Sequence, residues 1–352
     1  MAENSAPRFD FMIRLEILTT NYNHGLYLPE LIESVARQHR PGVGMFVIDD
    51  ASKDDSVDIL TKAAAKHAWL RFVVNEQNRG IQHNIHQLLH QSQAEFISFQ
   101  AADDILLSGF VEQTLSAFER YPQAGLCSGL SRLIDASGKE IGLCNPNPFP
   151  TNDLLFIPPR DALQTFMHFG CWIQGNTTSY PRKVLLNAGG FRPELHSFCD
   201  SFVQRLIALQ HGSCFIPRPI AAWRRLQSGY SATTGADPKI SREIQTCAVT
   251  LMREQPALFP ESYIRAWEKR WIFTTVTARA DQSREKLLNE LSVLLPGSAL
   301  RALKSFLIFL LNFAVKFVWL GAIITLVPQD ACRRAFFLAK NRFLRSFFPR
   351  KR

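Results

Sequence analysis

The sequence predicts an α/β fold in which a mostly parallel β-sheet is flanked by helices. Over the first 110 residues, short apolar runs alternate with amphipathic segments in steps of about thirty residues, which is the pattern of parallel strands joined by right-handed helical crossovers. A polar cluster also follows each apolar run. Because ligands bind at the carboxyl ends of the strands in such sheets, the same pattern predicts where a binding site lies.

Four segments have the length and the β-branched or aromatic content of strands, namely residues 15–20, 45–48, 71–74 and 95–99,. Three segments between them are predicted helices, residues 28–38, 56–67 and 81–91. In the first of these, apolar residues recur at the i, i+3, i+4, i+7 and i+8 positions of one helix face,. The middle of the chain is less regular, and residues 238–295 are predicted to be helical.

The polar clusters that follow the predicted strands are Thr20-Asn21-Tyr22, Asp49-Asp50, Asn78-Arg79-Gly80 and Asp103-Asp104. A single pair of acids most often marks a solvated turn. Parallel strands end on one rim of their sheet, however, so four clusters there predict one shared ligand site. The chain has no GxxxxGK[ST] loop and no complete dinucleotide-binding glycine motif,.

The positive charge of the chain is concentrated at its C-terminal end. From residue 297 onward, eleven lysines and arginines stand against one acid, so that this end carries a formal charge of +10 and residues 1–296 carry −1, for a total of +9. A nearly neutral body argues against a general nucleic-acid-binding protein. The basic end predicts contact with an anionic surface instead.

The same end is also apolar. Residues 305–327 are a run of 23 residues whose only charge is Lys316, long enough to span a bilayer of about 30 Å. Residues 330–348 have the spacing of a basic amphipathic helix that lies in a membrane interface. Residues 305–327 could span the membrane or lie in its plane, and we favour the in-plane arrangement. The alternative to both is that the whole segment packs as a helical hairpin inside a soluble body.

The seven cysteines are widely scattered and form no CxxC pair, so the sequence predicts neither a structural zinc site nor a disulfide framework. Residues 1–14 lack the basic start and apolar core of a signal peptide,. We therefore expect the bulk of the chain to stay in the cytoplasm.

Over about residues 13–232 the sequence resembles family 2 of the inverting glycosyltransferases. The resemblance rests on segments in the order and spacing of that family: 20–23 (TNYN), 28–35 (LPELIESV), 47–54 (VIDDASKD), 78–81 (NRGI), 96–104 (FISFQAADD) and 189–192 (GGFR). It implies a GT-A fold, a nucleoside-diphosphate sugar as donor, a divalent metal ion and inversion at the anomeric carbon.

The donor-binding residues that the resemblance implies follow the first three predicted strands. They are Thr20, Asn21, Tyr22, Asp50, Asn78 and Arg79. The Asp50 carboxylate would accept a hydrogen bond from a ring N–H of the base, and Asp49 would brace the turn or share that role.

The metal motif departs from the pattern of the family. The usual Asp-x-Asp aligns with Ala101-Ala102-Asp103, so its first carboxylate is missing. The resemblance implies Asp103 as the metal ligand and Asp104 as a further substrate contact. One carboxylate with two phosphate oxygens and water still suits Mg²⁺ or Mn²⁺. The alternative is that the two acids cap a helix that starts at Ile105.

The resemblance also implies a catalytic carboxylate at the start of a helix that faces the acceptor. Residues 197–202 match that position, and Asp200 is their only acid. It would take the proton of the attacking hydroxyl; the alternative is a helix N-cap. Further on, Arg224 or Arg225 would clamp the diphosphate, although Leu226 stands where the family usually has histidine.

The predicted domains are a glycosyltransferase domain over residues 1–235 (donor half about 13–110, acceptor half about 111–235), a helical extension over 236–296 and a membrane-associating tail over 297–352. The expected function is metal-dependent transfer of one sugar from a UDP-linked donor to a lipid-linked or cell-envelope glycan acceptor, in polysaccharide biosynthesis at the cytoplasmic face of the inner membrane. The alternative is a catalytically inactive, membrane-bound nucleotide-sugar binding protein, which Ala101, Cys199 and Leu226 suggest.

Overall fold

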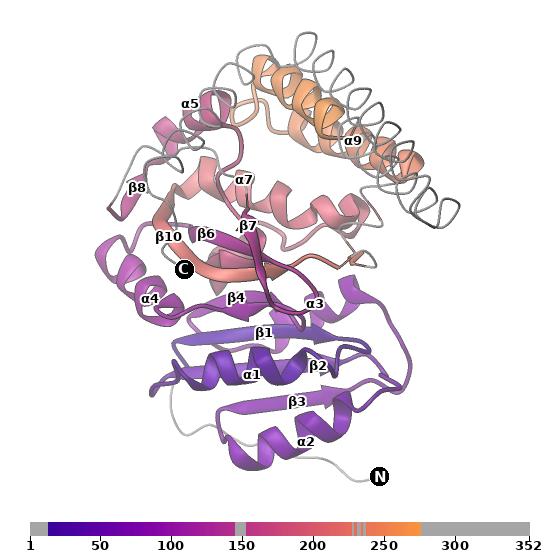
Figure 1. Cartoon of the computed structure of the whole chain (residues 1–352). Coiled ribbons are helices and arrows are strands. Elements are labelled where there is room, and N and C mark those ends of the chain that lie inside the picture. Colours follow the sequence, from indigo (N-terminus) through magenta and orange to yellow (C-terminus); the bar gives the residue numbers. More distant parts are fainter. Residues whose placement is uncertain (1–12, 145–152, 227–228, 231–233, 235–236, 276–352) are drawn as a thin grey trace, which may run out of the picture. The chain divides into compact units, whose positions relative to one another are not determined.

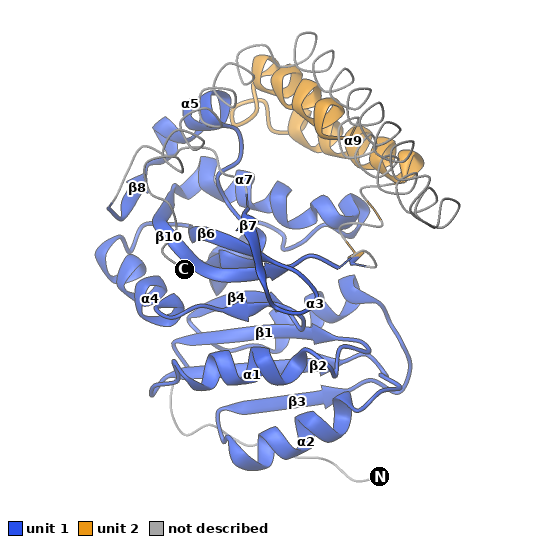
Figure 2. Cartoon of the chain, viewed as in Figure 1, with its two compact units in different colours: residues 1–229 blue, residues 230–352 orange. Residues whose placement is uncertain are grey.

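The structure, a computed structural model, describes residues 13–144, 153–226, 229–230, 234 and 237–275. The chain divides into two compact units, residues 1–229 and residues 230–352 (Figure 2). The first unit contains the sheet and every predicted site residue, and each unit is described by itself below.

A ten-stranded sheet forms the centre of the first unit (Figure 1), in the order β3-β2-β1-β4-β9-β6-β10-β5, with β7 paired to β6 and β8 paired to β10. The strands are β1 Leu15–Asn21, β2 Val43–Asp49, β3 Leu70–Val74, β4 Phe96–Ala101, β5 Ile105–Leu106, β6 Leu126–Ile134, β7 Glu140–Leu143, β8 Leu155–Ile157, β9 Ser179–Pro181 and β10 Ser213–Arg224.

Strands β3, β2, β1 and β4 form a parallel half of the sheet. Their register pairs Asn21 with Asp49, Asp49 with Val74, and Thr20 with Ala101. The polar clusters that follow these strands therefore leave the sheet at one edge. The predicted α/β class with a mostly parallel sheet and flanking helices is confirmed.

The helices of the first unit are α1 Leu28–Ala36, α2 Ser56–Lys66, α3 Ile81–Gln91, α4 Phe110–Arg120, α5 Pro159–Phe169, α6 Arg182–Asn187 and α7 Cys199–His211, with 3₁₀ turns η1 Gly175–Thr177 and η2 Pro193–Phe198. Leu31 and Val35 of α1 pack with Ile17 of β1 in the main apolar core. Helix α3 contacts β1 and β2, and its buried Leu88 lies outside that core. It thus covers the opposite face, as a right-handed crossover from β3 back to β4 requires.

The second half of the sheet is mixed. Strand β9 runs antiparallel to β4 and β6, and β10 runs parallel to β6, where buried Cys127 and Cys214 pair in register. The register of β10 shifts at Pro219, as expected of a proline that interrupts ladder pairing. Beyond the shift, Ala222 pairs with Ile105 of β5. The end of β10 therefore lies beside the segment that follows Asp103 and Asp104.

Helix α3 has the bounds that the sequence predicts, and α1 and α2 end one or two residues earlier than predicted. The alternative in which two acids cap a helix at Ile105 is wrong. Residues 105–106 form β5 because they pair with β10, and the next helix begins only at Phe110.

The second unit contains α9, Pro238–Arg253, and a further helical segment at residues 261–275. Asp237 caps α9 by accepting hydrogen bonds from Lys239 N and Ile240 N at 2.7 and 3.2 Å,. Trp271 Nε1 donates to Ser241 O at 3.2 Å and so ties the two helices together. Within the described ranges, no helix is long and apolar enough to cross a membrane. The predicted membrane segments lie outside those ranges.

Candidate functional site

Side-chain hydrogen bonds hold the end of β1 to the end of β2. Asn21 Nδ2 donates to Asp49 Oδ2 at 2.7 Å and to Ser52 Oγ at 3.2 Å. Asp49 Oδ1 in turn accepts from Ser52 N at 2.9 Å. These two predicted rim residues brace the loops, which is one of the two roles that the resemblance implies for Asp49.

The Asp50 carboxylate is the point at which the loop after β3 is fixed. It accepts from Asn75 Nδ2 at 2.8 Å, from Arg79 N at 2.8 Å and from Gly80 N at 2.9 Å. Burial alone would raise the pKa of Asp50, but these hydrogen bonds outweigh it and lower the pKa,. The Asn84 side chain also contributes to the lowered pKa of Asp50.

Of the other predicted donor residues, Asn21, Asn78 and Arg79 are bonded to Asp50 or to a residue that bonds it. Asp50 N donates to Asn21 O at 2.8 Å, which fixes Asp50 to the end of β1 next to half-buried Thr20. The side chain of Tyr22 is 45% exposed. Asn78 is also exposed, and its Oδ1 accepts from Gly80 N at 3.1 Å.

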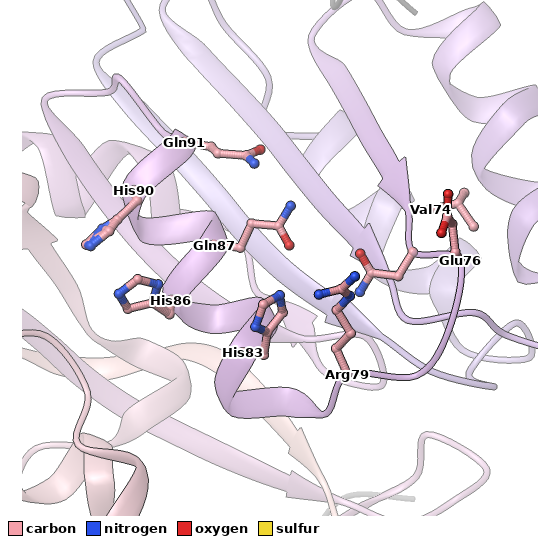
Figure 3. A pocket seen from close by; sticks show the side chains of 9 residues that line it. Val74, Glu76, Arg79, His83, His86, Gln87, His90 and Gln91 are labelled. Atoms are coloured by element: carbon pink, nitrogen blue, oxygen red, sulfur yellow. The ribbon is translucent and has the colours of Figure 1, made fainter. Parts of the chain in front are cut away.

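A pocket of about 560 Å³ lies between the loop after β3 and one face of α3 (Figure 3). The side chains of Arg79, His83 and Gln87 gather in it, and His86 and His90 project from the same helix (Figure 3). Asn75, which bonds Asp50, lines this pocket as well. Asn75 and Arg79 therefore both bond Asp50 and line this pocket.

The two neighbouring acids differ in their surroundings. Asp104 is buried, and its Oδ1 accepts from Arg224 N at 3.0 Å. Burial raises the pKa of Asp104 well above its ordinary value, and the Asp103 carboxylate adds to this shift. Asp103 keeps some exposure. Burial raises the pKa of Asp103 too, while His24 and Arg224 oppose the shift.

These surroundings fit a hard divalent cation at Asp103. Its carboxylate supplies the oxygen ligand that Mg²⁺ and Mn²⁺ prefer, and binding a cation would offset the burial that disfavours its ionised form. No three acidic, histidine or cysteine side chains of the described residues converge as a metal-binding group. The remaining ligands would therefore be phosphate oxygens and water, which is usual for Mg²⁺.

The two predicted arginines are in different environments. The side chain of Arg224 has no exposed surface, and its Nη2 donates to Glu30 Oε2 at 2.6 Å. Arg225 is exposed, with its guanidinium carbon 4.9 Å from the centre of the Trp223 ring. Of the two, only Arg225 presents a guanidinium that a diphosphate in solvent can reach.

Asp200 lies in the first turn of α7, and its Oδ1 accepts from Ser201 N at 2.5 Å. Burial raises its pKa, with opposing contributions from Ser201 N and Arg205. The residue before α7 is Phe198, and no side chain caps the helix. Cys199 beside Asp200 is buried, and burial raises its pKa to about 12. Asp200 keeps some exposure.

The turn η1 lies between the two acidic regions. A Cβ at Gly175 would stand 2.5 Å from Asp200 Oδ2, so the backbone of η1 touches the Asp200 carboxylate. On the other side, Asn176 O accepts from Gln100 Nε2 at 2.8 Å, and the Asn176 side chain favours ionisation of Asp104. Gly175 thus lies against Asp200, and its neighbour Asn176 is bonded to Gln100 of β4, three residues before Asp103.

Sequence reasoning missed several of these residues. Asn75, Asn84, Gly175 and Asn176 are all close to a predicted acid, and Asn75 Nδ2 bridges Asp50 to Asn84 Oδ1 at 2.8 Å. Asn75 could have been predicted from the sequence, because it directly follows the third predicted strand as the other clusters follow theirs. Gly175 and Asn176 had no such signal in the irregular middle of the chain.

Residues 16–151 match the model of glycosyl transferase family 2. Among curated proteins, the chain is 26% identical over 209 residues to an uncharacterised protein of Mycobacterium tuberculosis, which covers 58% of this chain and 64% of that protein. It is also 27% identical over 99 residues to the GalNAc(5)-diNAcBac-PP-undecaprenol β-1,3-glucosyltransferase of Campylobacter jejuni, covering 28% of this chain and 32% of that enzyme. The chain thus spans less than two thirds of the length of either relative.

Among solved structures, the mannosyltransferase of Pyrobaculum calidifontis in complex with GDP-Man and Mn²⁺ superimposes with a TM-score of 0.55 at 17% identity. The superposition covers 91% of this chain and 88% of that one. At this identity the likeness concerns the fold, which is the GT-A arrangement.

Proposed function

Because residues 16–151 form a glycosyl transferase family 2 domain, we propose that the protein is an inverting, metal-dependent glycosyltransferase. It transfers one sugar from a nucleoside-diphosphate sugar, with UDP as the first candidate nucleotide, to a lipid-linked or cell-envelope glycan. The undecaprenol-linked substrate named for the Campylobacter jejuni relative supports this class of acceptor.

The observation that carries the proposal is the arrangement of three acids. Asp50 and Asp103 follow parallel strands β2 and β4 at one rim, and η1 lies against Asp200 and is bonded to Gln100 of β4, three residues before Asp103. A rim of this kind is where α/β sheets bind ligands. The proposed reaction has three tasks. The nucleobase must be recognised, a cation must be held at the diphosphate, and a general base must accept the proton of the acceptor hydroxyl.

Each acid suits one of these tasks. The hydrogen bonds that lower the pKa of Asp50 keep it an acceptor for a ring N–H of the base, while exposed Tyr22 offers an aromatic face for stacking,. Asp103 and exposed Arg225 would hold the cation and the diphosphate. The cation supplies charge stabilisation for the departing nucleoside diphosphate.

Asp200 is the proposed general base. Its carboxylate takes the proton from the acceptor hydroxyl, whose oxygen forms the new bond to the anomeric carbon while the nucleoside diphosphate leaves. A pKa raised by burial makes a carboxylate a stronger proton acceptor, as long as it is ionised at the working pH,. The η1 backbone against Asp200 Oδ2 holds it in one orientation.

The test is a panel of nucleotide-sugar donors, including UDP-sugars and GDP-mannose, scored by nucleoside diphosphate release with a membrane extract as acceptor. We expect release with one donor class, dependent on both the extract and Mg²⁺ or Mn²⁺. Donor binding without release under any condition would favour an inactive nucleotide-sugar binding protein. That alternative draws support from Ala101, Cys199 and Leu226, at which the chain departs from the pattern of the family.

We further propose that the protein works at the cytoplasmic face of the inner membrane. The support is the charge of +10 beyond residue 296 and the apolar run beside it, because basic and apolar segments together attach proteins to anionic membranes. An acceptor linked to a lipid would then meet the site at the membrane surface.

A further inference from the structure

We propose that Arg224 is a positioning residue that holds the Asp103–Asp104 segment in place, and that it does not bind the diphosphate. The inference rests on the proposed function in that Asp103 is taken as the metal ligand. It differs from the role that the sequence motif suggests for Arg224.

Every nitrogen of the Arg224 guanidinium already donates to an oxygen of the protein. Nε donates to Asp103 O at 2.9 Å, and Nη1 donates to Asp135 O and Ala136 O, both at 3.2 Å. Nη2 donates to Glu30 Oε2 at 2.6 Å. A guanidinium has five N–H donors in a fixed fork. With its side chain completely buried, Arg224 has no free edge for a phosphate.

The contacts of Arg224 join three segments that are far apart in sequence. The ring of Tyr27 stands 4.5 Å from its guanidinium carbon, so that Tyr27 and Glu30 anchor it to the start of α1. Asp135 O and Ala136 O belong to the turn between β6 and β7. The third segment is held twice, since Nε bonds Asp103 O and the backbone N of Arg224 bonds Asp104 Oδ1.

Glu30 is the counterion that makes this arrangement stable. A buried charge without its partner is costly, whereas Glu30 itself is half exposed and can be replaced without opening a cavity. Loss of the ion pair between Arg224 and Glu30 should therefore loosen the backbone around Asp103 and weaken the binding of the metal ion by Asp103.

The experiment compares Glu30→Ala with Glu33→Ala. Both glutamates lie on α1, both are half exposed, and both pair with an arginine, but Glu33 pairs with exposed Arg37 only. Full-length protein is studied by amide hydrogen exchange, by the Mn²⁺ concentration for half-maximal transfer and by UDP affinity in EDTA. Arg224→Lys serves as a second variant, which keeps the charge and loses the fork.

We expect Glu30→Ala and Arg224→Lys to lose exchange protection at residues 101–106 and 135–138. We also expect the Mn²⁺ requirement to rise by about 10- to 100-fold, the range for partners that orient metal ligands. Metal-free UDP affinity should stay unchanged, and Glu33→Ala should match the wild type in every measurement.

Weaker metal-free UDP binding with unchanged exchange would overturn the proposal and make Arg224 a diphosphate clamp. A lower melting temperature with an unchanged Mn²⁺ requirement would overturn it as well, because it would mean that Arg224 is structural only. A wild-type protein without metal-dependent transfer would refute the proposed function instead. The exchange comparison would still decide whether Arg224 holds the Asp103 segment.

Discussion

Asp103 and Asp104 are adjacent in the chain but differ in what their carboxylates touch. Asp103 keeps some exposure, whereas Asp104 is buried and accepts from Arg224 N at 3.0 Å. We expect Asp103→Ala to abolish transfer and to weaken donor binding in Mg²⁺ or Mn²⁺, with little change in melting temperature. Asp104→Ala should reduce transfer less and should destabilise the fold by about 1–3 kcal/mol, because it leaves Arg224 N unpaired.

Calorimetry of donor binding with and without EDTA, together with thermal melts, measures both effects. Transfer that survives EDTA and the Asp103→Ala substitution alike would show that the metal assignment is wrong.

Asp200 is the residue at which pH should matter most. Asp200→Asn should lower the transfer rate by about 10²–10⁴-fold, the usual contribution of a general base, with nearly unchanged donor affinity. The acid limb of the rate profile should lie above that of an ordinary carboxyl, because burial raises the pKa of Asp200 from 3.8. If calorimetry shows that donor binding collapses, Asp200 does not belong to the acceptor side.

The same shift sets the sign of a stability effect. A raised pKa means that the folded state holds the Asp200 proton more tightly than the unfolded state does. The contribution of Asp200 to the free energy of unfolding is therefore largest below pH 3.8 and falls as the pH rises through the folded-state pKa,. Asparagine does not titrate, so Asp200→Asn does not lose this stability as the pH rises. Its melting temperature relative to the wild type should therefore increase with pH over this window.

At the scale of elements, η1 matters because its backbone lies against the proposed base. A Cβ at Gly175 would approach Asp200 Oδ2 to 2.5 Å, whereas one at Gly142 on β7 would meet nothing within 4 Å. Gly175→Ala should therefore displace the carboxylate and lower the transfer rate, while Gly142→Ala should leave it unchanged. Equal rates for the two variants in steady-state assays would mean that η1 does not orient Asp200.

Sequence periodicity predicted the donor half of the fold well, because local signals decide it. Helix α3 has its predicted bounds, and the clusters after β1 to β4 leave the sheet at one edge. The surroundings of Arg224 were not predictable in this way. Its carboxylate partner, Glu30, is 194 positions away, and no local pattern reveals a pairing that only the packing of α1 against the end of β10 creates.

At the scale of the whole molecule, the chain combines a nearly neutral body with a basic and apolar end. We expect truncation before Pro296 to give a soluble protein that still binds nucleotide, since the predicted site residues all precede residue 232. Replacing Arg333, Arg334, Arg342 and Arg345 with Gln should weaken binding to anionic vesicles by about 1 kcal/mol per charge. Vesicle sedimentation at increasing salt measures this.

Apolar burial is not screened by salt, so some attachment should persist after the four substitutions. Complete release of the full-length protein from membranes by high salt would instead indicate that the apolar run packs inside the fold. Aggregation of the truncated protein would lead to the same conclusion.

The buried cysteines can report local unfolding of the protein through their rates of alkylation. Burial raises the pKa of Cys199 and of Cys214 each to about 12 and that of Cys127 well above its ordinary value, and only the thiolate reacts with alkylating reagents. Labelling of Cys127 and Cys214 should therefore await separation of β6 from β10, whereas labelling of Cys199 awaits movement of the start of α7. Mass spectrometry can follow the labelling of Cys127 and Cys214 separately from that of Cys199. The two rates would measure opening of the sheet and opening beside Asp200 without an introduced probe.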